Sequence, residues 1–415
     1  MNPAAPDKKA AAFQIRVKLA SSLAEISAED WNACVGGRST AGNKLSPQVA
    51  TAPLAGNPFV SHQFLSALEA SASVGARTGW QPRHLLAESA DGELIGAAPC
   101  YVKTHSRGEY VFDQGWAEAY ERAGGRYYPK LQVAVPFTPV TGPRLLTRPG
   151  FNANTIRAAL GEALEEVTDR NNLSSAHVTF ADEAQARELE RRGFLLRTDQ
   201  QFHWENNGYG SFDDFLAALS SRKRKTIRRE RKDALEAGIE VVWLTGGELT
   251  ESVWDAFFGF YMETGSRKWG RPYLTREFFS RIGETMGERI ALVMARRNGR
   301  WIAGAINFVG DGTLYGRNWG AIEHHPFLHF ELCYYQAIDY AIRHGLKRVE
   351  AGAQGEHKLA RGYLPSTTYS AHYIADPALK RAVADYLERE RAYVDAAGAE
   401  LAAAAPFRKD LAETE

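Results

Sequence analysis

A dense group of polar residues late in the chain has side chains suited to transfer chemistry. Residues 354–358 read QGEHK. A lysine beside a transfer centre can hold a phosphate or stabilise an oxyanion, and a histidine or carboxylate can accept a proton from an attacking amine. We therefore take Lys358, His357 and Glu356 as candidate catalytic residues and Gln354 as a candidate binding residue. The alternative is that these side chains only cap a helix and pair with one another.

Two predicted elements place this group at the end of a strand. Apolar residues with helical spacing run over 330–342, and a short strand is expected over 348–351. In α/β domains, ligands commonly bind at the carboxyl ends of strands. We therefore expect one cleft to be lined by the polar group together with side chains near the helix and strand, namely Tyr335, Gln336, His329 and Arg361.

A second feature that could bind a substrate is a run of basic residues over 222–232, which holds eight basic side chains and one acid. The run follows a predicted helix over 212–219, and Arg222, Arg224 and Arg228 are candidate contacts for the phosphates of a nucleotide-linked substrate or of RNA. Aromatic residues are not interleaved with the basic ones, so stacking on single-stranded bases is not indicated.

The sequence lacks the motifs of several other site classes. His325 and His329 have the i, i+4 spacing of a metal-binding pair, but the HExxH pattern is absent, so no metal site is expected. There is no Gly-x-Ser-x-Gly elbow, no Walker A motif and no dinucleotide fingerprint after a strand. The three cysteines are far apart, which argues against a disulfide framework.

Length and composition favour two domains of an ordinary globular protein. The chain has 415 residues, 50 basic and 50 acidic side chains and a 44% hydrophobic content. The balanced charge gives no overall attraction to nucleic acid or membrane. No apolar run approaches the length of a membrane span, and the N-terminus has no signal-peptide core, so a cytoplasmic location is expected.

Weak landmarks recur in the same order along the chain and indicate a tandem duplication of one α/β unit. The segment 58–66 resembles 272–280, the turn at Asp91-Gly92 resembles Asn298-Gly299, and 192–195 resembles 361–364. The expected units cover 13–206 and 207–376, after a disordered N-terminus over 1–12 and before a C-terminal helical segment over 377–415. The first unit carries an additional aromatic insertion near 105–146, and the predicted site lies in the second unit.

Five long motifs resemble the Fem-like bacterial family labelled peptidoglycan biosynthesis/recognition, which is related to the GNAT N-acyltransferases. They are NPFVSHQFL, GEYVFDQGWAEAY, YYPKLQVAVPFTPVTGPRLL, LHFELCYYQAIDYA and GAQGEHKLARGY. The resemblance implies an α/β fold made of two tandem GNAT-like domains. Better-studied Fem transferases move an amino acid from aminoacyl-tRNA to a peptidoglycan precursor and carry a late aromatic-Lys-x-x-aromatic-Gly motif, which 357–363 resembles with His357 in the aromatic position.

This resemblance leads us to expect an acyl- or aminoacyl-transferase that forms an amide on an amine acceptor such as a muropeptide. The donor is left open between acyl-CoA and aminoacyl-tRNA, and no cofactor is assigned. The segment 317–326 lacks the glycine pattern of the CoA-binding turn, whereas the basic run would suit tRNA. Two alternatives remain: a non-catalytic module that recognises a cell-wall precursor or other phosphate-bearing ligand, and an RNA-binding protein that uses the basic helix.

Overall fold

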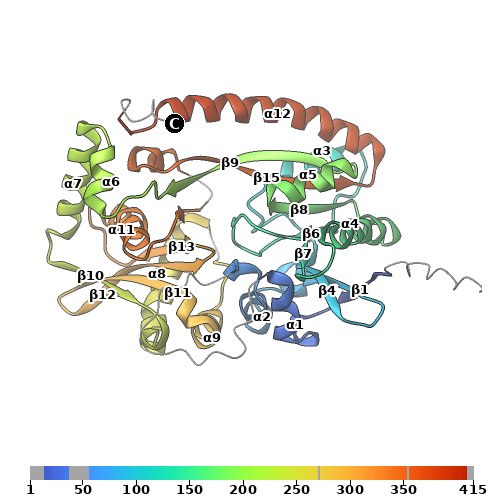
Figure 1. The fold of residues 1–415 in the computed structure, drawn as a ribbon, viewed down its shortest axis with the longest axis horizontal. Coiled ribbons are helices and arrows are strands. Elements are labelled where there is room, and N and C mark those ends of the chain that lie inside the picture. The colour runs from blue at the N-terminus through green and yellow to red at the C-terminus, as the bar shows by residue number, and fades with distance from the viewer. Residues whose placement is uncertain (1–13, 37–55, 270–271, 353–354, 409–415) are drawn as a thin grey trace, which may run out of the picture.

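The computed structural model describes residues 14–36, 56–269, 272–352 and 355–408 (Figure 1). Two similar halves lie side by side and share a central sheet, and a long C-terminal helix runs across both of them. The disorder expected over 1–12 falls outside the described residues.

The central sheet has eleven strands among the described residues, in the order β10-β11-β12-β13-β14-β9-β15-β8-β6-β5-β2. A smaller sheet has the order β1-β3-β4-β7. The strands of the first half are β1 (Arg16–Ala20), β2 (Trp80–Pro82), β3 (His84–Glu88), β4 (Leu94–Ala98), β5 (Cys100–Lys103), β6 (Lys130–Val133), β7 (Leu146–Thr147), β8 (Ser175–Ala181) and β9 (Leu195–Glu205). Those of the second half are β10 (Ile239–Leu244), β11 (Ile290–Arg297), β12 (Arg300–Gly310), β13 (Thr313–Ala321), β14 (Arg348–Glu350) and β15 (Leu364–Ile374).

The two halves exchange their last strands. Strand β9 ends the first half but lies between β14 and β15, whereas β15 ends the second half and pairs with β8 of the first. His203 of β9 is therefore opposite Glu350 of β14, and His372 of β15 is opposite His177 of β8. The exchange joins the halves through main-chain hydrogen bonds. The expected domain boundary between residues 206 and 207 stays a prediction.

Each half also contains one parallel strand pair with a helical connection, as a duplicated α/β unit requires. In the first half β6 pairs with β8, and in the second half β13 pairs with β14. The helices are α1 (Ala28–Val35), α2 (His62–Ala70), α3 (Gln114–Arg122), α4 (Ala153–Arg170), α5 (Glu183–Arg191), α6 (Phe212–Ala218), α7 (Ser221–Leu235), α8 (Glu251–Trp269), α9 (Arg276–Met286), α10 (Leu328–Phe330), α11 (Gln336–Arg343) and α12 (Pro377–Ala403).

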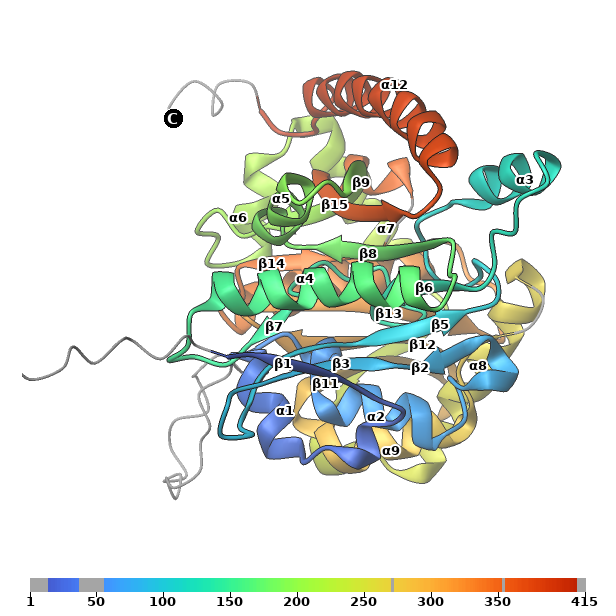
Figure 2. The same ribbon diagram turned by 90° about the vertical axis from the view of Figure 1, so that its right-hand side faces the viewer.

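Two duplicated helices meet where the halves contact each other. Helix α2 packs against α9, and the ring of Phe64 lies edge-on to that of Phe278 with 5.6 Å between centroids. These phenylalanines occupy matching places in the repeated segments, so the contact relates like surfaces in the manner of an internal two-fold. Figure 2 shows α1, α2 and α9 together on one side of the sheet, with α12 on the opposite side.

Helix α12 spans the exchanged strands. Glu390 accepts two hydrogen bonds from Arg197 of β9, at 2.8 and 2.7 Å. Beyond the helix, Phe407 forms a bridge with Leu219, next to the start of the basic helix α7. The C-terminal part of the chain therefore reaches from the first half to the base of α7 (Figure 1).

Candidate functional site

A buried charged pair lies where β13 and β14 separate. The two strands pair only from Thr313↔Arg348 to Tyr315↔Glu350. Just beyond this point, Nη2 of Arg317 lies 3.6 Å from Oε2 of Glu350, and both side chains are almost fully buried. This splayed end of a parallel pair is the kind of place where an α/β sheet binds ligands.

Several polar atoms of this pair have no hydrogen-bond partner among the described residues. They are Nε and Nη2 of Arg317 and Oε2 of Glu350. The remaining oxygen, Oε1 of Glu350, accepts a hydrogen bond from Oγ1 of Thr141 at 3.1 Å. Burial raises the pKa of Glu350 and lowers that of Arg317, although each charge partly offsets this effect on the other. Unsatisfied buried donors and an acceptor side by side are costly in a fold, and a bound ligand could satisfy them.

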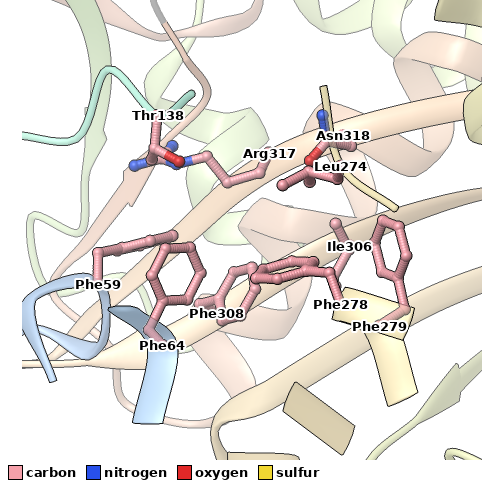
Figure 3. Close-up of a pocket in the computed structure, with 10 residues that line it drawn as sticks. All are labelled: Phe59, Phe64, Thr138, Leu274, Phe278, Phe279, Ile306, Phe308, Arg317 and Asn318. Atoms are coloured by element: carbon pink, nitrogen blue, oxygen red, sulfur yellow. The ribbon is translucent and has the colours of Figure 1, made fainter. Parts of the chain in front are cut away.

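Next to the guanidinium of Arg317 is a small cavity lined by phenylalanines from both halves (Figure 3). Its volume of about 10 Å³ is roughly the space that one water molecule needs. The Cζ atom of Arg317 lies 4.8 Å above the ring of Phe59, so the cation covers one end of the apolar lining. The other lining residues are Phe64, Thr138, Leu274, Phe278, Phe279, Ile306, Phe308 and Asn318.

The predicted residue Lys358 also lies at this end of β14. It belongs to the short helix η7 (Glu356–Arg361), is 2% exposed, and donates from Nζ to the carbonyl oxygen of Gly352 at 2.9 Å. Burial lowers its pKa to about 8, and Arg317 adds to the effect. Its observed hydrogen-bond partner is thus a main-chain carbonyl and not a carboxylate. The side chain of Glu356 lies outside the described residues, as does Gln354.

Four further predicted residues lie in a neighbouring cluster, two at Glu230 of α7 and two at Tyr334. Arg361 donates from Nη2 to Oε2 of Glu230 at 2.8 Å, and the hydroxyl of Tyr335 donates to the same oxygen. The ring of His357 lies 6.4 Å from that of His329, and its Nε2 is 2.9 Å from the hydroxyl of Tyr334. The structure thus brings four of the predicted residues together, but their role stays a prediction.

Gln336 joins this cluster from the side of the central helix. The helix is interrupted by a π-turn over Glu331–Tyr335, a feature that often occurs at functional sites. Gln336 donates to Oε1 of Glu331 at 2.8 Å, and Arg231 of α7 pairs with the same carboxylate at 3.0 Å.

The basic helix α7 contacts this cluster mainly through residues other than its predicted binding residues. Its buried face consists of Ile227, Glu230 and Ala234. Arg222 and Arg228 are exposed, and Arg224 is half-buried. The helix therefore presents basic side chains to solvent beside the cluster, which is the arrangement that a polyanion could bind.

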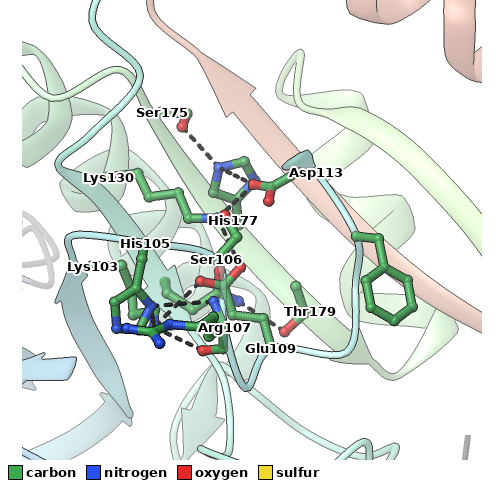
Figure 4. Close-up of polar contacts among 12 residues, drawn as sticks. Lys103, His105, Ser106, Arg107, Glu109, Asp113, Lys130, Ser175, His177 and Thr179 are labelled. Atoms are coloured by element: carbon green, nitrogen blue, oxygen red, sulfur yellow. Dashed lines mark hydrogen bonds and ion pairs between the residues drawn. The ribbon is translucent and has the colours of Figure 1, made fainter. Parts of the chain in front are cut away.

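The first half holds a different charged network at the base of its aromatic insertion (Figure 4). Nζ of Lys130 lies 2.7 Å from Glu109, 2.5 Å from Asp113 and 2.9 Å from Oγ of Ser106. Burial alone would lower the pKa of Lys130, but the two carboxylates raise it above its usual value. Lys103, directly opposite on β5, is 3.6 Å from Glu109. These contacts fasten the insertion to the sheet.

The positions that match the charged residues of the second half are apolar in the first. The parallel ladders end at Val133↔Val178 in the first half and at Tyr315↔Glu350 in the second, so an alignment of the ladder ends sets Val178 against Glu350. Two residues further along, Val135 matches Arg317. Gly193 and Gly362, both with positive φ, place Leu189 opposite Lys358. In these alignments Glu350, Arg317 and Lys358 of the second half each have an apolar counterpart in the first half.

Sequence reasoning had not selected Arg317, Glu350 or Thr141 as site residues. In the sequence, Arg317 belongs to the segment 317–326, which lacks the glycine pattern of a CoA-binding turn, and Thr141 belongs to the aromatic insertion. Within the described ranges no three metal-ligating side chains gather at one place, and no helix is long and apolar enough to cross a membrane. His325 instead lies 2.9 Å from Glu323.

Comparison with solved structures shows the fold. FemX is 12% identical with a TM-score of 0.51, covering 86% of this chain and 98% of FemX. A conserved protein of unknown function from Bacteroides thetaiotaomicron VPI-5482 is 9% identical with a TM-score of 0.50, covering 87% and 100%. A tandem GNAT protein from the clavulanic acid biosynthesis pathway is 14% identical with a TM-score of 0.40, covering 88% and 99%. The likeness to FemX and the repeated strand arrangement confirm the predicted fold class, an α/β duplication of the Fem-transferase type.

The sequence comparisons identify the family. No curated protein matches the chain. The model of the Fem-like family described as peptidoglycan biosynthesis/recognition matches residues 22–409, which is nearly the whole chain. The resemblance found in the sequence motifs is thereby confirmed, and the chain belongs to this Fem-like family of peptidoglycan biosynthesis and recognition proteins.

Proposed function

We propose that this protein transfers an aminoacyl group to an amine of a peptidoglycan precursor, and that the second half carries the transfer site. The observation that supports this most is the buried Arg317–Glu350 pair next to an apolar cavity, which has donors and an acceptor that no described residue hydrogen-bonds. Membership of the family supports the cell-wall acceptor.

The polarity of the site favours an aminoacyl donor over a plain acyl donor. Nε and Nη2 of Arg317, which have no hydrogen-bond partner among the described residues, can donate to the carbonyl oxygen of the donor, and Oε2 of Glu350 can accept from its α-ammonium group. A plain acyl group has no ammonium and would leave the carboxylate unsatisfied. The side chain of the amino acid would then enter the phenylalanine-lined cavity, which admits only a small group.

In this proposal Lys358 assists the transfer step. The acceptor nitrogen forms the amide bond to the donor carbonyl carbon, the bond to the leaving oxygen breaks, and one proton passes from the amine to that oxygen. With a pKa of about 8, the ammonium of Lys358 can stabilise the oxyanion, give its proton to the leaving oxygen and regain one from the amine. Its first-half counterpart Leu189 cannot act in this way.

The basic face of α7 makes aminoacyl-tRNA the donor that we propose. Its exposed arginines Arg222 and Arg228 lie on the helix whose Glu230 contacts Arg361. Phosphates of the tRNA would be attracted to this face by sequence-independent electrostatics. Acyl-CoA remains the alternative donor for the assay to test.

The test is an incubation of the purified protein with UDP-linked muropeptides and either a pool of charged tRNAs or acyl-CoA esters. Mass spectrometry should show a mass gain of one amino acid on the muropeptide with charged tRNA only. Glu350→Gln should reduce this transfer at least tenfold, whereas Arg296→Gln, which removes an exposed surface pair with Glu240, should not. Muropeptide binding without any mass gain would instead indicate a recognition module.

A further inference from the structure

One side chain of the first half reaches the carboxylate in the second-half site. Thr141 lies between β6 and β7, 209 residues before Glu350, and its Oγ1 donates to Oε1 of Glu350. The hydroxyl thereby holds one carboxylate oxygen, while Oε2, 3.6 Å from Nη2 of Arg317, has no hydrogen-bond partner among the described residues. Building on the proposed function, we propose that Thr141 is a positioning residue that keeps Oε2 of Glu350 directed at the donor ammonium group.

The segment 138–144 that carries Thr141 is fixed at both of its neighbouring strands. The amide of Gly142 donates to the carbonyl oxygen of Phe180 at 3.1 Å, at the end of β8. Nε of the fully buried Arg144 donates to the carbonyl oxygen of Thr179 at 2.9 Å. On the other side, Gln201 of the exchanged strand β9 donates to the carbonyl oxygen of Pro139 at 2.6 Å. A hydroxyl on so restrained a segment loses little conformational freedom when it orients a carboxylate.

Gly142 shows how closely this segment is packed. Its φ of +146° lies in a region that favours glycine, and a Cβ atom would come within 2.4 Å of Nδ2 of Asn57. The same Asn57 atom donates to the carbonyl oxygen of Thr141 at 3.0 Å. The main chain at Thr141 and at Gly142 is therefore held in one conformation.

The same segment occupies the first-half place that matches the second-half site. Strands β6 and β8 stop pairing at Val133↔Val178, as β13 and β14 do at Tyr315↔Glu350. In the first half the carbonyl oxygens at the end of β8 are bound by Gly142 and Arg144 of the chain itself. In the first half, the segment 138–144 thus hydrogen-bonds to the end of β8. At the corresponding place in the second half, polar atoms of Arg317 and Glu350 have no hydrogen-bond partner among the described residues.

The segment also connects the carboxylate to the cavity. Thr138 lines the phenylalanine cavity, and Thr141, three residues later, contacts Glu350. A group that enters the cavity therefore meets the same segment that orients the carboxylate. This arrangement would position the side chain and the ammonium group of one donor together.

The inference is tested by binding of two matched probes, alaninamide and propionamide, which differ only in the ammonium group. NMR titration of the full chain should show that Thr141→Val weakens alaninamide about tenfold, because an undirected carboxylate pairs less well with a cation. Propionamide affinity should stay the same, and Thr141→Ser should restore alaninamide binding. Thr147→Val on β7 is the control for the loss of a threonine hydroxyl, and it should leave both probes unaffected.

The possible results separate this inference from the proposed function. If the wild-type protein binds alaninamide no better than propionamide, recognition of the ammonium group by Glu350 is wrong, and the proposed aminoacyl donor fails with it. If the wild type prefers alaninamide and Thr141→Val keeps the full preference, only the role of Thr141 is wrong. Equal weakening of both probes by Thr141→Val, with Thr141→Ser giving no recovery, would indicate a purely structural role.

Discussion

Replacing Lys358 by methionine should make the protein more stable and inactive at the same time. Methionine has a similar length and can fill the same buried space without a charge. The pKa of Lys358 falls from its usual 10.5 to about 8 on burial, which corresponds to a cost of about 3 kcal/mol for the charged form. Losing the hydrogen bond to Gly352 would offset about 1 kcal/mol of this, so a net gain of roughly 2 kcal/mol is expected.

The pH dependence of this gain has a defined sign. Because the folded-state pKa of this base lies below the unfolded-state value, the lysine destabilises the fold fully below about pH 8. The cost shrinks as the pH rises toward 10.5, where the unfolded lysine also loses its proton. Urea denaturation at pH 7 and at pH 10.5 should therefore show a stabilised Lys358→Met variant at pH 7 and a much smaller difference at pH 10.5.

A matched variant in the first half should show the opposite combination. Leu189→Ala removes a buried side chain at the equivalent position and should lower the free energy of unfolding by about 2–5 kcal/mol. Aminoacyl transfer by its folded fraction should be retained, whereas Lys358→Met should lose at least a hundredfold in rate. A Lys358→Met variant that is equally destabilised at both pH values and still active would refute the catalytic assignment and make Lys358 a structural tether.

Two further predictions concern the other charged regions. Lys130→Met should destabilise the protein by roughly 3–5 kcal/mol at pH 7, because the buried carboxylates of Glu109 and Asp113 lose their cation. The loss should be smaller at pH 5, where these carboxylates are more easily protonated. Urea denaturation at both pH values measures the loss, and a loss that does not depend on pH would contradict this prediction. Replacing Arg222, Arg224 and Arg228 together by glutamine should weaken tRNA binding and reduce the dependence of the affinity on salt concentration. Filter binding measures both effects. An unchanged affinity for tRNA at low and high salt would exclude this face of α7 as the tRNA contact.

The sequence was sufficient for the features that depend on local pattern and internal repetition. The similarity of 58–66 to 272–280 predicted the duplication, and the corresponding helices are found in contact with each other. Lys358 was expected at the end of a strand because a helix, a strand and a polar group follow in that order. Each of these inferences needed only the spacing of residues within one segment.

The pairing between halves could not be read from the sequence. Strands β9 and β15 have similar patterns of apolar and polar residues, so either strand could pair with the edge strand of either half. Only the complete fold decides which pairing forms. Arg317, Glu350 and Thr141 lie on three separate segments without a shared motif. Their proximity arises from the strand register and from a loop that crosses between halves, neither of which leaves a periodic signal.

The exchange of the last strands has a consequence for the order in which the chain can fold during synthesis. Strand β8 acquires one of its neighbours, β15, only after residues 364–374 have left the ribosome. Until then the nascent first half presents an unpaired strand edge, which is a template for pairing with other chains. When residues 1–206 are expressed alone, β15 is never supplied, so this edge stays open unless β9 of the same chain or a strand of another chain pairs with it. The duplicated chain thus resembles a dimer with exchanged arms whose two subunits were joined during evolution, so that the correct partner strand is always supplied by the same polypeptide.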